Sequence, residues 1–349
     1  MFGGEFRVLE LAGSATDRGE THGRSLKTEI GLYLDERLRL SGEAEWSGRA
    51  ARQEEIRAIA ESTLRLHQAY DADLFEEMAA MAEAAGISAA EAVVVGGFTD
   101  LIDIIRTTGG TTAVEDDCTA VIDPRSGVLA QTWDMHASAG DYLVMFDLKP
   151  DNGPGALLQS TAGCLGQIGI NEAGIAVGIN NLTAWGRPGV TWPFAVRKAL
   201  ARPTVADAVE AIAGAPLAGG HNFLVLGPDG DGYDIEAMPG SVDVRRTSGK
   251  ALFHTNHCLA EATVAEEAPR LQHFVESSRE RLEVAMASST GPIGRDTAME
   301  LFAHPTICRR APTPDDVASC GAVIMEPRQR SMWAAWGYPD QAEYQLFSL

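Results

Sequence analysis

Residues 118–134 read CTAVIDPRSGVLAQTWD. Two runs rich in apolar and β-branched residues, 119–123 and 128–133, flank a short segment that contains proline and glycine and is typical of a tight turn. If the turn is centred in the middle of that segment, Cys118 faces Trp133 across the two strands. The stretch therefore predicts a β-hairpin whose first strand begins beside a cysteine.

This hairpin brings Asp134 beside Cys118, because opposed residues have Cβ atoms about 4.5–5.5 Å apart. A cysteine in this place can attack the peptide bond that precedes it. Cleavage between Asp117 and Cys118 would then make Cys118 the N-terminal residue of a new chain. Its α-amino group, with a pKa of about 7.7–8.0, suits proton transfer near neutrality, and the thiol is a competent nucleophile. We therefore expect an amide-processing enzyme that makes its own nucleophile.

The first third of the chain is predicted to be mostly helical. Residues 26–40 and 53–70 carry apolar side chains at helical spacing, and Gly86 is placed to end a further helix. Ser88 and Glu91 have the spacing of a capping box. Residues 106–117 are rich in threonine, glycine and acidic residues, and predict an exposed linker.

After residue 118 the pattern changes to hairpins. Besides the first one, the predicted strand pairs are 167–170 with 175–180, 223–226 with 233–237, 242–246 with 251–254, and 322–325 with 332–336. Helical patterns occupy residues 193–213 and 269–287. Antiparallel strands with clustered helices predict an α+β fold, and two stacked sheets covered by helices would bury this pattern best.

Composition narrows the class of protein. The 349 residues are 45% apolar, enough for a real core, and carry 28 basic against 49 acidic residues, a net charge of −21. Nucleic acid and anionic membranes are therefore not expected as partners. The five cysteines show no disulfide spacing, and neither a signal peptide nor a transmembrane run is apparent. We expect a cytoplasmic protein with free thiols.

Residues 254–258 read HTNHC and follow a predicted strand. Strand ends present polar side chains to sites, so Asn256 is a candidate donor to a developing oxyanion. The alternative is that His254, His257 and Cys258 bind a metal ion. Histidines three apart on a strand point to opposite faces, which does not favour a shared metal, and we expect no metal site.

Four motifs in this order resemble one known family. Cys118-Thr119, Trp133-Asp134, GINEAGIAV at 169–177 and HTNHC at 254–258 are similar to the acyl-coenzyme A:6-aminopenicillanic acid acyltransferase (isopenicillin N acyltransferase) family. The resemblance implies an αββα four-layer sandwich of the N-terminal-nucleophile hydrolase type. It extends from near the N-terminus to about residue 309.

The resemblance also implies residue roles. Cys118 matches the cysteine that cuts the precursor and then serves as nucleophile. Asp134 matches the aspartate that supports the new amino group, and Asn256 matches an oxyanion and positioning group. Two positions depart from the family pattern: Asp117 stands where the penicillin enzyme has glycine, and Cys320 stands where that enzyme has an arginine before a glycine.

Other residues are candidates for the pocket. Trp133, Asn180, His221 and His257 could line it, although packing is the favoured interpretation of Trp133 and Asn256 could simply satisfy backbone groups at a strand end. Cys118 could also be a small core residue, and Asp134 a turn cap.

The function predicted from the sequence is a cysteine amidohydrolase that is activated by its own cleavage and acts on a small N-acyl amine or N-acyl amino acid. The intermediate is an acyl group on Cys118. One alternative is an acyltransferase that moves an acyl group from a thioester or amide to an amine acceptor. Another is a protein that lacks catalysis, or that binds a metal through His254, His257 and Cys258.

The predicted organisation is one composite domain made of two chains. Residues 1–117 form a helical α chain, a pro-segment that packs on the core, and residues 118–349 form a sheet-rich β chain that carries the nucleophile. The two chains are expected to stay associated after cleavage. No cofactor is expected.

Overall fold

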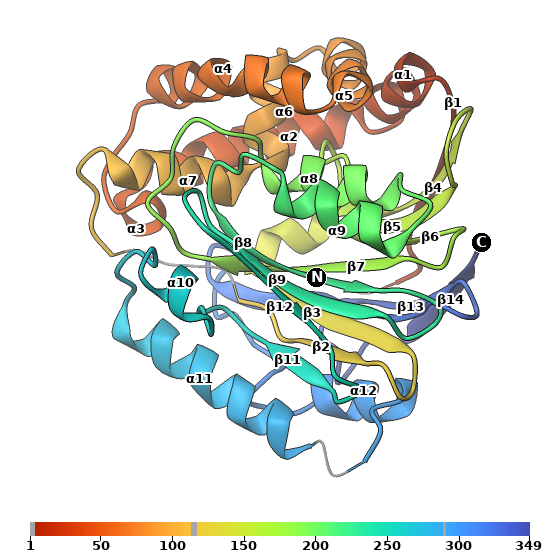
Figure 1. The fold of residues 1–349 in the computed structure, drawn as a ribbon. Coiled ribbons are helices and arrows are strands. Elements are labelled where there is room, and N and C mark those ends of the chain that lie inside the picture. Colours follow the sequence, from red (N-terminus) through yellow and green to blue (C-terminus); the bar gives the residue numbers. More distant parts are fainter. Residues whose placement is uncertain (1–3, 113–116, 289–290) are drawn as a thin grey trace.

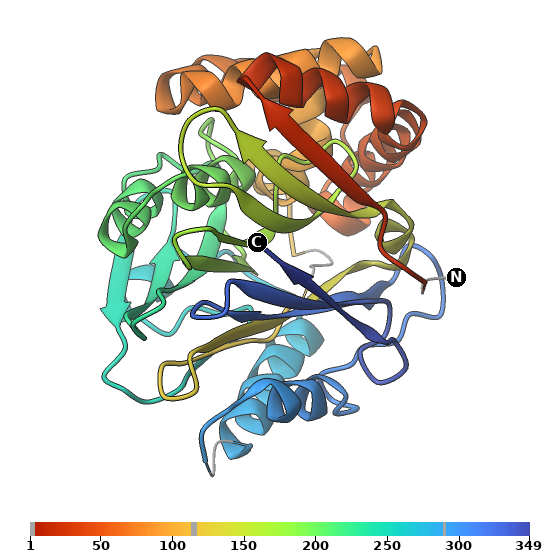
Figure 2. The ribbon, with the colours of Figure 1, turned by 90° about the vertical axis from the view of Figure 1, so that its right-hand side faces the viewer.

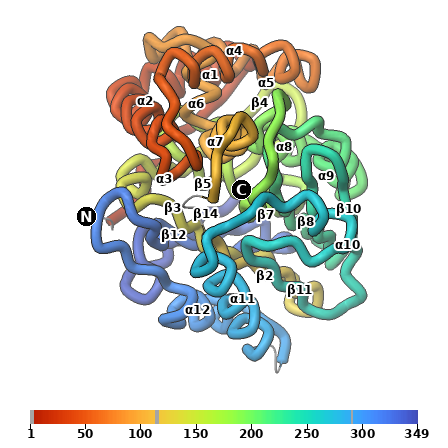
Figure 3. Tube along the Cα trace, turned by 90° about the vertical axis from the view of Figure 1, so that its left-hand side faces the viewer, coloured from red at the N-terminus to blue at the C-terminus, as the bar shows by residue number. Residues whose placement is uncertain are grey.

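The computed structural model describes residues 4–112, 117–288 and 291–349. Within these residues, two β-sheets lie face to face between two layers of helices (Figure 1). The view in Figure 3 places the helices of residues 15–107 at the top, α11 and α12 at the bottom, and the strands between them. The predicted α+β fold with αββα layers is confirmed.

The first sheet has eight strands in the described part of the chain, in the order β1-β4-β5-β6-β7-β8-β9-β10. Their bounds are β1 Val8–Gly13, β4 Leu143–Pro150, β5 Ala156–Thr161, β6 Ile168–Asn171, β7 Ala176–Leu182, β8 Gly220–Leu226, β9 Gly232–Ala237 and β10 Val242–Arg246.

The second sheet has six strands over the same described ranges, in the order β11-β2-β3-β12-β13-β14. Their bounds are β2 Ala120–Asp123, β3 Val128–His136, β11 Leu252–His254, β12 Val317–Glu326, β13 Ser331–Trp336 and β14 Tyr344–Ser348.

The helices form the two outer layers. Those on the side of the first sheet are α1 Ala15–Ser25, α2 Lys27–Gly42, α3 Ala44–Ser47, α4 Gln53–Tyr70, α5 Ala72–Ala85, α6 Ala89–Gly96, α7 Phe98–Thr107, α8 Trp192–Leu200 and α9 Val205–Ala213. The later helices are α10 Glu261–Val264, α11 Gln272–Ala287 and α12 Arg295–Phe302, and a 3-10 turn, η1, covers Ala137–Tyr142. The helix predicted over 193–213 is therefore two helices, with Pro203 in the break.

The helix signals of the first third are confirmed. Ser88 caps α6 by accepting a hydrogen bond from the backbone N–H of Glu91, and the Glu91 carboxylate accepts from the N–H of Ser88. Gly86 ends α5 with a φ of 83°, a left-handed conformation that favours glycine. These local rules operate within one turn of helix, which is why the sequence alone revealed them.

The first hairpin has the predicted register. Asp123 faces Val128 at the turn end of β2 and β3, and Asp117 bridges Asp134 at the other end. Cys118 therefore lies one residue inside that bridge. The strands predicted at 167–180, 223–237 and 322–336 also form β6–β7, β8–β9 and β12–β13.

One predicted hairpin is wrong. Residues 242–246 and 251–254 do not pair with each other. β10 pairs with β9 at the edge of the first sheet, whereas β11 pairs with β2 in the second sheet. The chain crosses between the two sheets after Arg246, because Phe253 is buried on the second sheet while alternate residues of β10 face solvent.

The two sheets contact each other closely next to this hairpin. The side-chain oxygen of Gln131 in β3 accepts from the N–H of Ile179 in β7 at 2.7 Å, and its Nε2 donates to the carbonyl of Ile179 at 2.9 Å. Gly178 allows this approach, since a Cβ there would lie 2.5 Å from the Gln131 oxygen. The second sheet is thereby held in register with the first beside Cys118.

The N-terminal segment contributes more than helices. β1 runs parallel to β4, with Val8 opposite Met145 and Gly13 opposite Pro150. Figure 2 shows β1, in red, lying along this strand. The strands β1, β4, β5 and β14 were not predicted from the sequence. A parallel edge strand such as β1, far from its partner in sequence, leaves no turn signal.

The expected exposed linker over 106–117 is only partly right. Arg106 and Thr107 end α7, and Arg106 is 1% exposed. Asp117 is fully buried. Residues 113–116 lie outside the described residues.

Among the described residues, no single helix has both the length and the apolar composition needed to cross a membrane. One bent pair, Ala72–Ala85 with Ala89–Gly96, passes that test on length and composition together, with an angle of 103° between its helices. These helices form part of the helical layer over the first sheet.

Candidate active site

Cys118 lies two residues before the start of β2, at the end of the second sheet, with 3% of its surface exposed. The neighbouring residues extend the ladder of the hairpin, because the N–H of Thr132 donates to the carbonyl of Thr119 at 2.9 Å. Asp134 faces Asp117 in the pair next to Cys118 and Trp133, as the predicted register requires. The structure therefore places the proposed nucleophile and the proposed carboxylate in neighbouring pairs of the same hairpin.

Both polar groups of the peptide bond between Asp117 and Cys118 are hydrogen-bonded. The N–H of Cys118 donates to Oδ1 of Asn256 at 2.7 Å, and the carbonyl of Asp117 accepts from the N–H of Asp134 at 3.1 Å. Arg281 of α11 donates to the carbonyl of Cys118 at 2.6 Å. The peptide bond before Cys118 and the carbonyl group after it are therefore both held by hydrogen bonds.

The carboxyl group of Asp134 is fully buried. Burial raises its pKa to about 7, although the nearby positive charge of Arg281 and a hydrogen bond from Ser319 oppose the rise. The hydroxyl of Ser319, on β12, donates to Oδ1 at 2.7 Å, while Oδ2 makes no hydrogen bond within the described part of the chain. One oxygen of this carboxyl is therefore available for a new donor.

Asn256 presents its oxygen to Cys118. Its Oδ1 also accepts from Arg281 at 3.0 Å, while its Nδ2 donates to the carbonyl of Asn181 at 3.1 Å. The backbone N–H of Asn256 donates to Ser278 at 2.9 Å, which fixes the residue on α11. In the uncut chain the side chain thus holds the Cys118 nitrogen. The oxyanion-donor role predicted from the sequence stays a prediction for the processed enzyme.

Asp117 is paired with two arginines that sequence reasoning missed. Nη2 of Arg281 lies 2.7 Å from Oδ1 of Asp117, and Arg309 forms an ion pair with Oδ2. Burial lowers the pKa of Arg309. Arg281 is 164 residues away from Asp117 in sequence, so no local pattern connects them.

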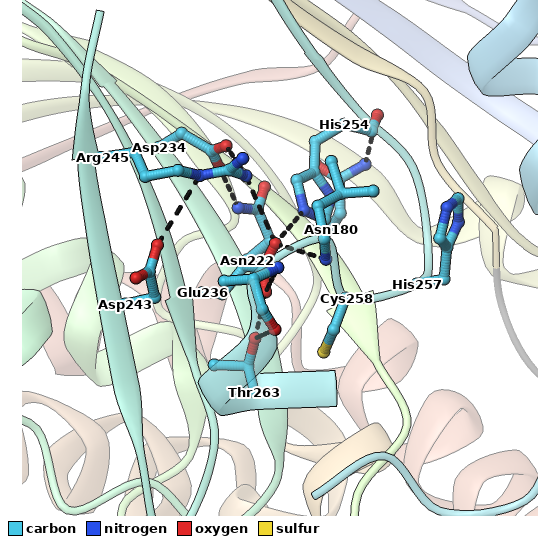
Figure 4. Close-up of polar contacts among 12 residues, drawn as sticks. Asn180, Asn222, Asp234, Glu236, Asp243, Arg245, His254, His257, Cys258 and Thr263 are labelled. Atoms are coloured by element: carbon cyan, nitrogen blue, oxygen red, sulfur yellow. Dashed lines mark hydrogen bonds and ion pairs between the residues drawn. The ribbon is translucent and has the colours of Figure 1, made fainter. Parts of the chain in front are cut away.

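A carboxylate behind the site organises the loop that carries Asn256 (Figure 4). Glu236 of β9 accepts from the N–H groups of Leu259 at 2.8 Å and Ala260 at 3.2 Å and from the Thr263 hydroxyl, and lies 3.1 Å from Nε2 of His254. Burial tends to raise the pKa of Glu236, but its hydrogen bonds and the His254 charge lower it to about 2. Glu236 therefore anchors both ends of this loop.

The three residues of the metal alternative have separate partners. His254 faces Glu236, Nδ1 of His257 lies 2.8 Å from the Ser278 hydroxyl, and Sγ of Cys258 contacts the sulfur of Met238 at 3.9 Å. Figure 4 shows His257 pointing away from His254. In the described ranges, no group of three or more His, Cys, Asp or Glu residues is arranged to hold a metal ion.

A cavity of about 30 Å³ adjoins Cys118. This is room for little more than one water molecule in the uncut chain. Its walls, which come from both sheets and from the helical layer above them, are formed by Arg37, Val95, Gly96, Phe98, Thr99, Cys118, Trp133, Met135, Gln167, Ile179, Asn181, Trp192 and His221.

Two of the four residues that were predicted to line the pocket are in the wall of this cavity. Trp133 and His221 line it, and Nε2 of His221 lies 3.0 Å from Oδ1 of the buried Asp100. Asn180 and His257 are not among the described residues of its wall. Asn180 instead donates to the carbonyl of His254 at 3.5 Å. Its two neighbours in sequence, Ile179 and Asn181, line the cavity.

A sequence model of the acyl-coenzyme A:6-aminopenicillanic acid acyl-transferase family matches residues 122–341, well over half of the chain. The chain belongs to this family. A relative from Emericella nidulans, the 40 kDa form of acyl-coenzyme A:6-aminopenicillanic-acid-acyltransferase, is 26% identical over 253 residues, which are 71% of this chain and 68% of that protein.

Solved structures of two acylases are also similar. A mutant conjugated bile acid hydrolase from Clostridium perfringens has a TM-score of 0.43 at 9% identity and covers 67% of this chain and 97% of its own. Penicillin V acylase from Agrobacterium tumefaciens has a TM-score of 0.31 at 13% identity, with coverage of 65% and 77%. Scores this low carry no argument about this chain.

Family membership makes the chain an enzyme, with acyl transfer as the general chemistry of its family. The family match begins at residue 122, after Cys118. The roles of the individual residues at the site therefore remain proposals.

Proposed function

We propose that this enzyme is a cysteine amidohydrolase that cuts its own chain between Asp117 and Cys118 and then hydrolyses small N-acyl amines or N-acyl amino acids. One observation carries the proposal. The peptide bond before a buried cysteine is held at its N–H by Asn256 and at its C=O by the N–H of Asp134. The carbonyl that the thiol would attack therefore already accepts a hydrogen bond, and the nitrogen that would leave is already held.

Self-cleavage begins when Sγ of Cys118 attacks the carbonyl carbon of Asp117. The negative charge that develops on the carbonyl oxygen is stabilised by the N–H of Asp134, which already donates to it. The C–N bond then breaks as the nitrogen takes up the proton that the thiol has lost, so that the nitrogen leaves as an amine held by Asn256 and a thioester remains. Water hydrolyses this thioester and frees the C-terminal carboxylate of Asp117 and the thiol of Cys118.

Turnover repeats the same steps on a substrate amide. Sγ of Cys118 attacks the acyl carbon, the substrate amine departs with a proton from the new α-amino group, and water hydrolyses the acyl-Cys118 thioester. Asp134, whose Oδ2 makes no hydrogen bond among the described residues, is proposed to hold that amino group. Asn256 is expected to donate to the oxyanion once the site is processed.

Acyl transfer is the second candidate. The relative from Emericella nidulans carries an acyltransferase name, and an amine can replace water as the group that attacks the acyl-Cys118 thioester. Hydrolysis is preferred here because water is the default acceptor.

The proposal includes two associated chains, 1–117 and 118–349, and a reducing compartment such as the cytoplasm. The five cysteines are all free and buried. Their retention as thiols is typical of a reducing environment.

The function is tested by trapping the acyl intermediate. Purified enzyme is mixed with a panel of N-acyl amines and N-acyl amino acids, quenched in acid within the first turnovers, and analysed by intact mass spectrometry. We expect the acyl mass on the 118–349 chain and its absence in Cys118→Ala. Turnover of a substrate by Cys118→Ala at the wild-type rate would contradict the proposal.

A further inference from the structure

Arg37 is a buried cation in the wall of the Cys118 cavity, and no carboxylate of the described residues forms an ion pair with it. It lies on α2 and is 3% exposed. Nη1 donates to the sulfur of Met135 at 3.6 Å and Nη2 to the hydroxyl of Tyr33, while Nε makes no hydrogen bond among the described residues. None of these contacts neutralises the guanidinium charge.

A buried charge is costly unless it is paired, so its partners matter. The guanidinium carbon of Arg37 lies 4.0 Å from the ring centre of Phe98 and 4.5 Å from that of Tyr33. Two aromatic faces offset part of the desolvation cost. Burial raises the pKa of Tyr33, so its hydroxyl remains neutral. Among the described residues, the contacts of Arg37 therefore include no anion.

The rest of the wall fits an anion with an apolar body. Phe98, Trp133 and Trp192 contribute aromatic surface, and carboxylate is absent from the residues described as lining the cavity. A guanidinium binds a carboxylate through two parallel N–H···O hydrogen bonds. A tyrosine hydroxyl or a methionine sulfur cannot take the place of the carboxylate in this arrangement.

We propose that Arg37 binds a carboxylate of the substrate, so that the enzyme acts on amides that carry a negative charge close to the bond that Cys118 attacks. This assignment deepens the proposed function and rests on it for the identity of the reacting thiol. The carboxylate can belong to the amine side, as in an N-acyl amino acid, or to the acyl side, as in a dicarboxylic monoamide.

The first experiment needs no substrate. Iodoacetate and iodoacetamide both alkylate a thiolate, forming a bond from sulfur to carbon and releasing iodide, and they differ chiefly in charge. We measure the ratio of their rate constants at Cys118 by mass spectrometry of the cysteine-containing peptide. Arg37→Gln should lower the ratio of iodoacetate to iodoacetamide by about 10- to 100-fold, the scale of one hydrogen bond to a charged group.

Arg39→Gln is the matched control on the same helix. Arg39 is 45% exposed and pairs with Glu43 and Asp315 on the surface. This variant should keep the wild-type ratio, and Arg37→Lys should retain part of it. Equal ratios in wild type and Arg37→Gln would overturn the assignment.

A second measurement uses unaltered enzyme, in case Arg37→Gln does not fold. Butyrate should protect Cys118 from iodoacetamide, and butyramide, which has the same shape without the charge, should protect at least tenfold less well, as expected for a hydrogen bond to a charged group. Equal protection by the two compounds would overturn the assignment.

Matched substrates then locate the carboxylate. Succinyl-p-nitroanilide against butyryl-p-nitroanilide tests the acyl side, and butyrylglycine against butyrylglycinamide tests the amine side. We expect the charged member of one pair to be preferred and that preference to vanish in Arg37→Gln. If no amide is turned over, the proposed function fails while the alkylation ratio still decides the role of Arg37. Equal kcat/KM within both pairs would overturn the assignment.

Discussion

The two residues that flank the proposed cleavage point are held very differently. Asp117 is fixed through its side chain by Arg281 and Arg309, whereas Cys118 is fixed through its backbone by Asn256. The backbone around the proposed cleavage point is therefore held in place, and groups held in a fixed geometry react more readily through proximity.

The pKa of Asp134 gives a pH dependence with a definite sign. Because burial raises this pKa to about 7, the carboxylate form increases as pH rises through 7. If Asp134 accepts the proton that the reaction releases, self-cleavage should accelerate with pH and fall about tenfold per unit well below 7. The rate is measured by following the two product masses after transfer of freshly folded protein to buffers from pH 5.5 to 8.5.

Asp134→Asn should slow cleavage by about 100-fold or more and remove the inflection near pH 7. A raised carboxyl pKa contributes stability below the unfolded value of 3.8 that is lost as pH rises through 7. At pH 8 this variant should therefore be at least as stable as wild type, which separates lost chemistry from misfolding. Asp151→Asn, on the surface, is the control. A wild-type profile in Asp134→Asn would show that the carboxylate is only structural.

Asn256 offers a second test at the level of one side chain. Loss of one oxyanion donor costs about 2.7–4 kcal/mol of transition-state stabilisation. In the processed enzyme, Asn256→Ala should therefore lower kcat by about 100- to 1,000-fold with little change in KM, measured by steady-state kinetics. Under the metal alternative, a chelator would inactivate and changes at His254 or His257 would be more harmful. Chelator sensitivity together with normal turnover by Asn256→Ala would remove this role.

At the level of elements, the loop after β11 depends on a carboxylate from the other sheet. Glu236 is fully buried and accepts hydrogen bonds from four groups of that loop or its flanks. Since its pKa is lowered to about 2, its contribution to stability is present above the unfolded value of 4.5 and is lost as pH falls towards 2.

Glu236→Gln should lower stability by about 3 kcal/mol or more above pH 4.5, the scale of breaking one partner of a buried ion pair. It should also flatten the fall in stability between pH 4.5 and 2. Thermal and denaturant unfolding across this range measure both effects, with the exposed Glu261→Gln on α10 as control. If the two variants unfold alike, the loop does not depend on this carboxylate.

The elements also show which features the sequence can predict. The register around Cys118 was predictable because one short turn fixes it, and Asp134 followed from that register. The strands β10 and β11 were paired wrongly because the choice between sheets depends on burial of Phe253 far from any turn. Arg281, Arg309 and Ser319 were missed because distant elements deliver them, and polar residues at those positions carry no local signature.

At the level of the molecule, the proposed cleavage divides a continuous core. β1 lies in the first sheet beside β4, and the buried Glu77 of α5 pairs with Arg197 of α8 at 2.8 Å and with Arg18 at 2.7 Å. The pairing of β1 with β4 and the ion pair of Glu77 with Arg197 cross between residues 1–117 and 118–349. Separation of the two pieces would expose a buried ion pair and the face of a sheet.

We therefore expect the cut chains to stay together. Residues 1–117 and 118–349 should elute as one complex in gel filtration under native conditions and separate only in denaturant. Glu77→Ala, which leaves Arg18 and Arg197 unpaired, should lower the denaturant concentration for separation, consistent with a cost of about 3–5 kcal/mol. Two pieces that separate in native buffer would contradict the composite domain.

Self-cleavage is tested most directly by the mass of the purified chain under denaturing conditions. The account predicts two masses for wild type, residues 1–117 and 118–349, and a single mass of all 349 residues for Cys118→Ala. A wild-type chain that stays whole on long incubation near pH 8, or efficient cutting at the same bond by Cys118→Ala, would contradict it.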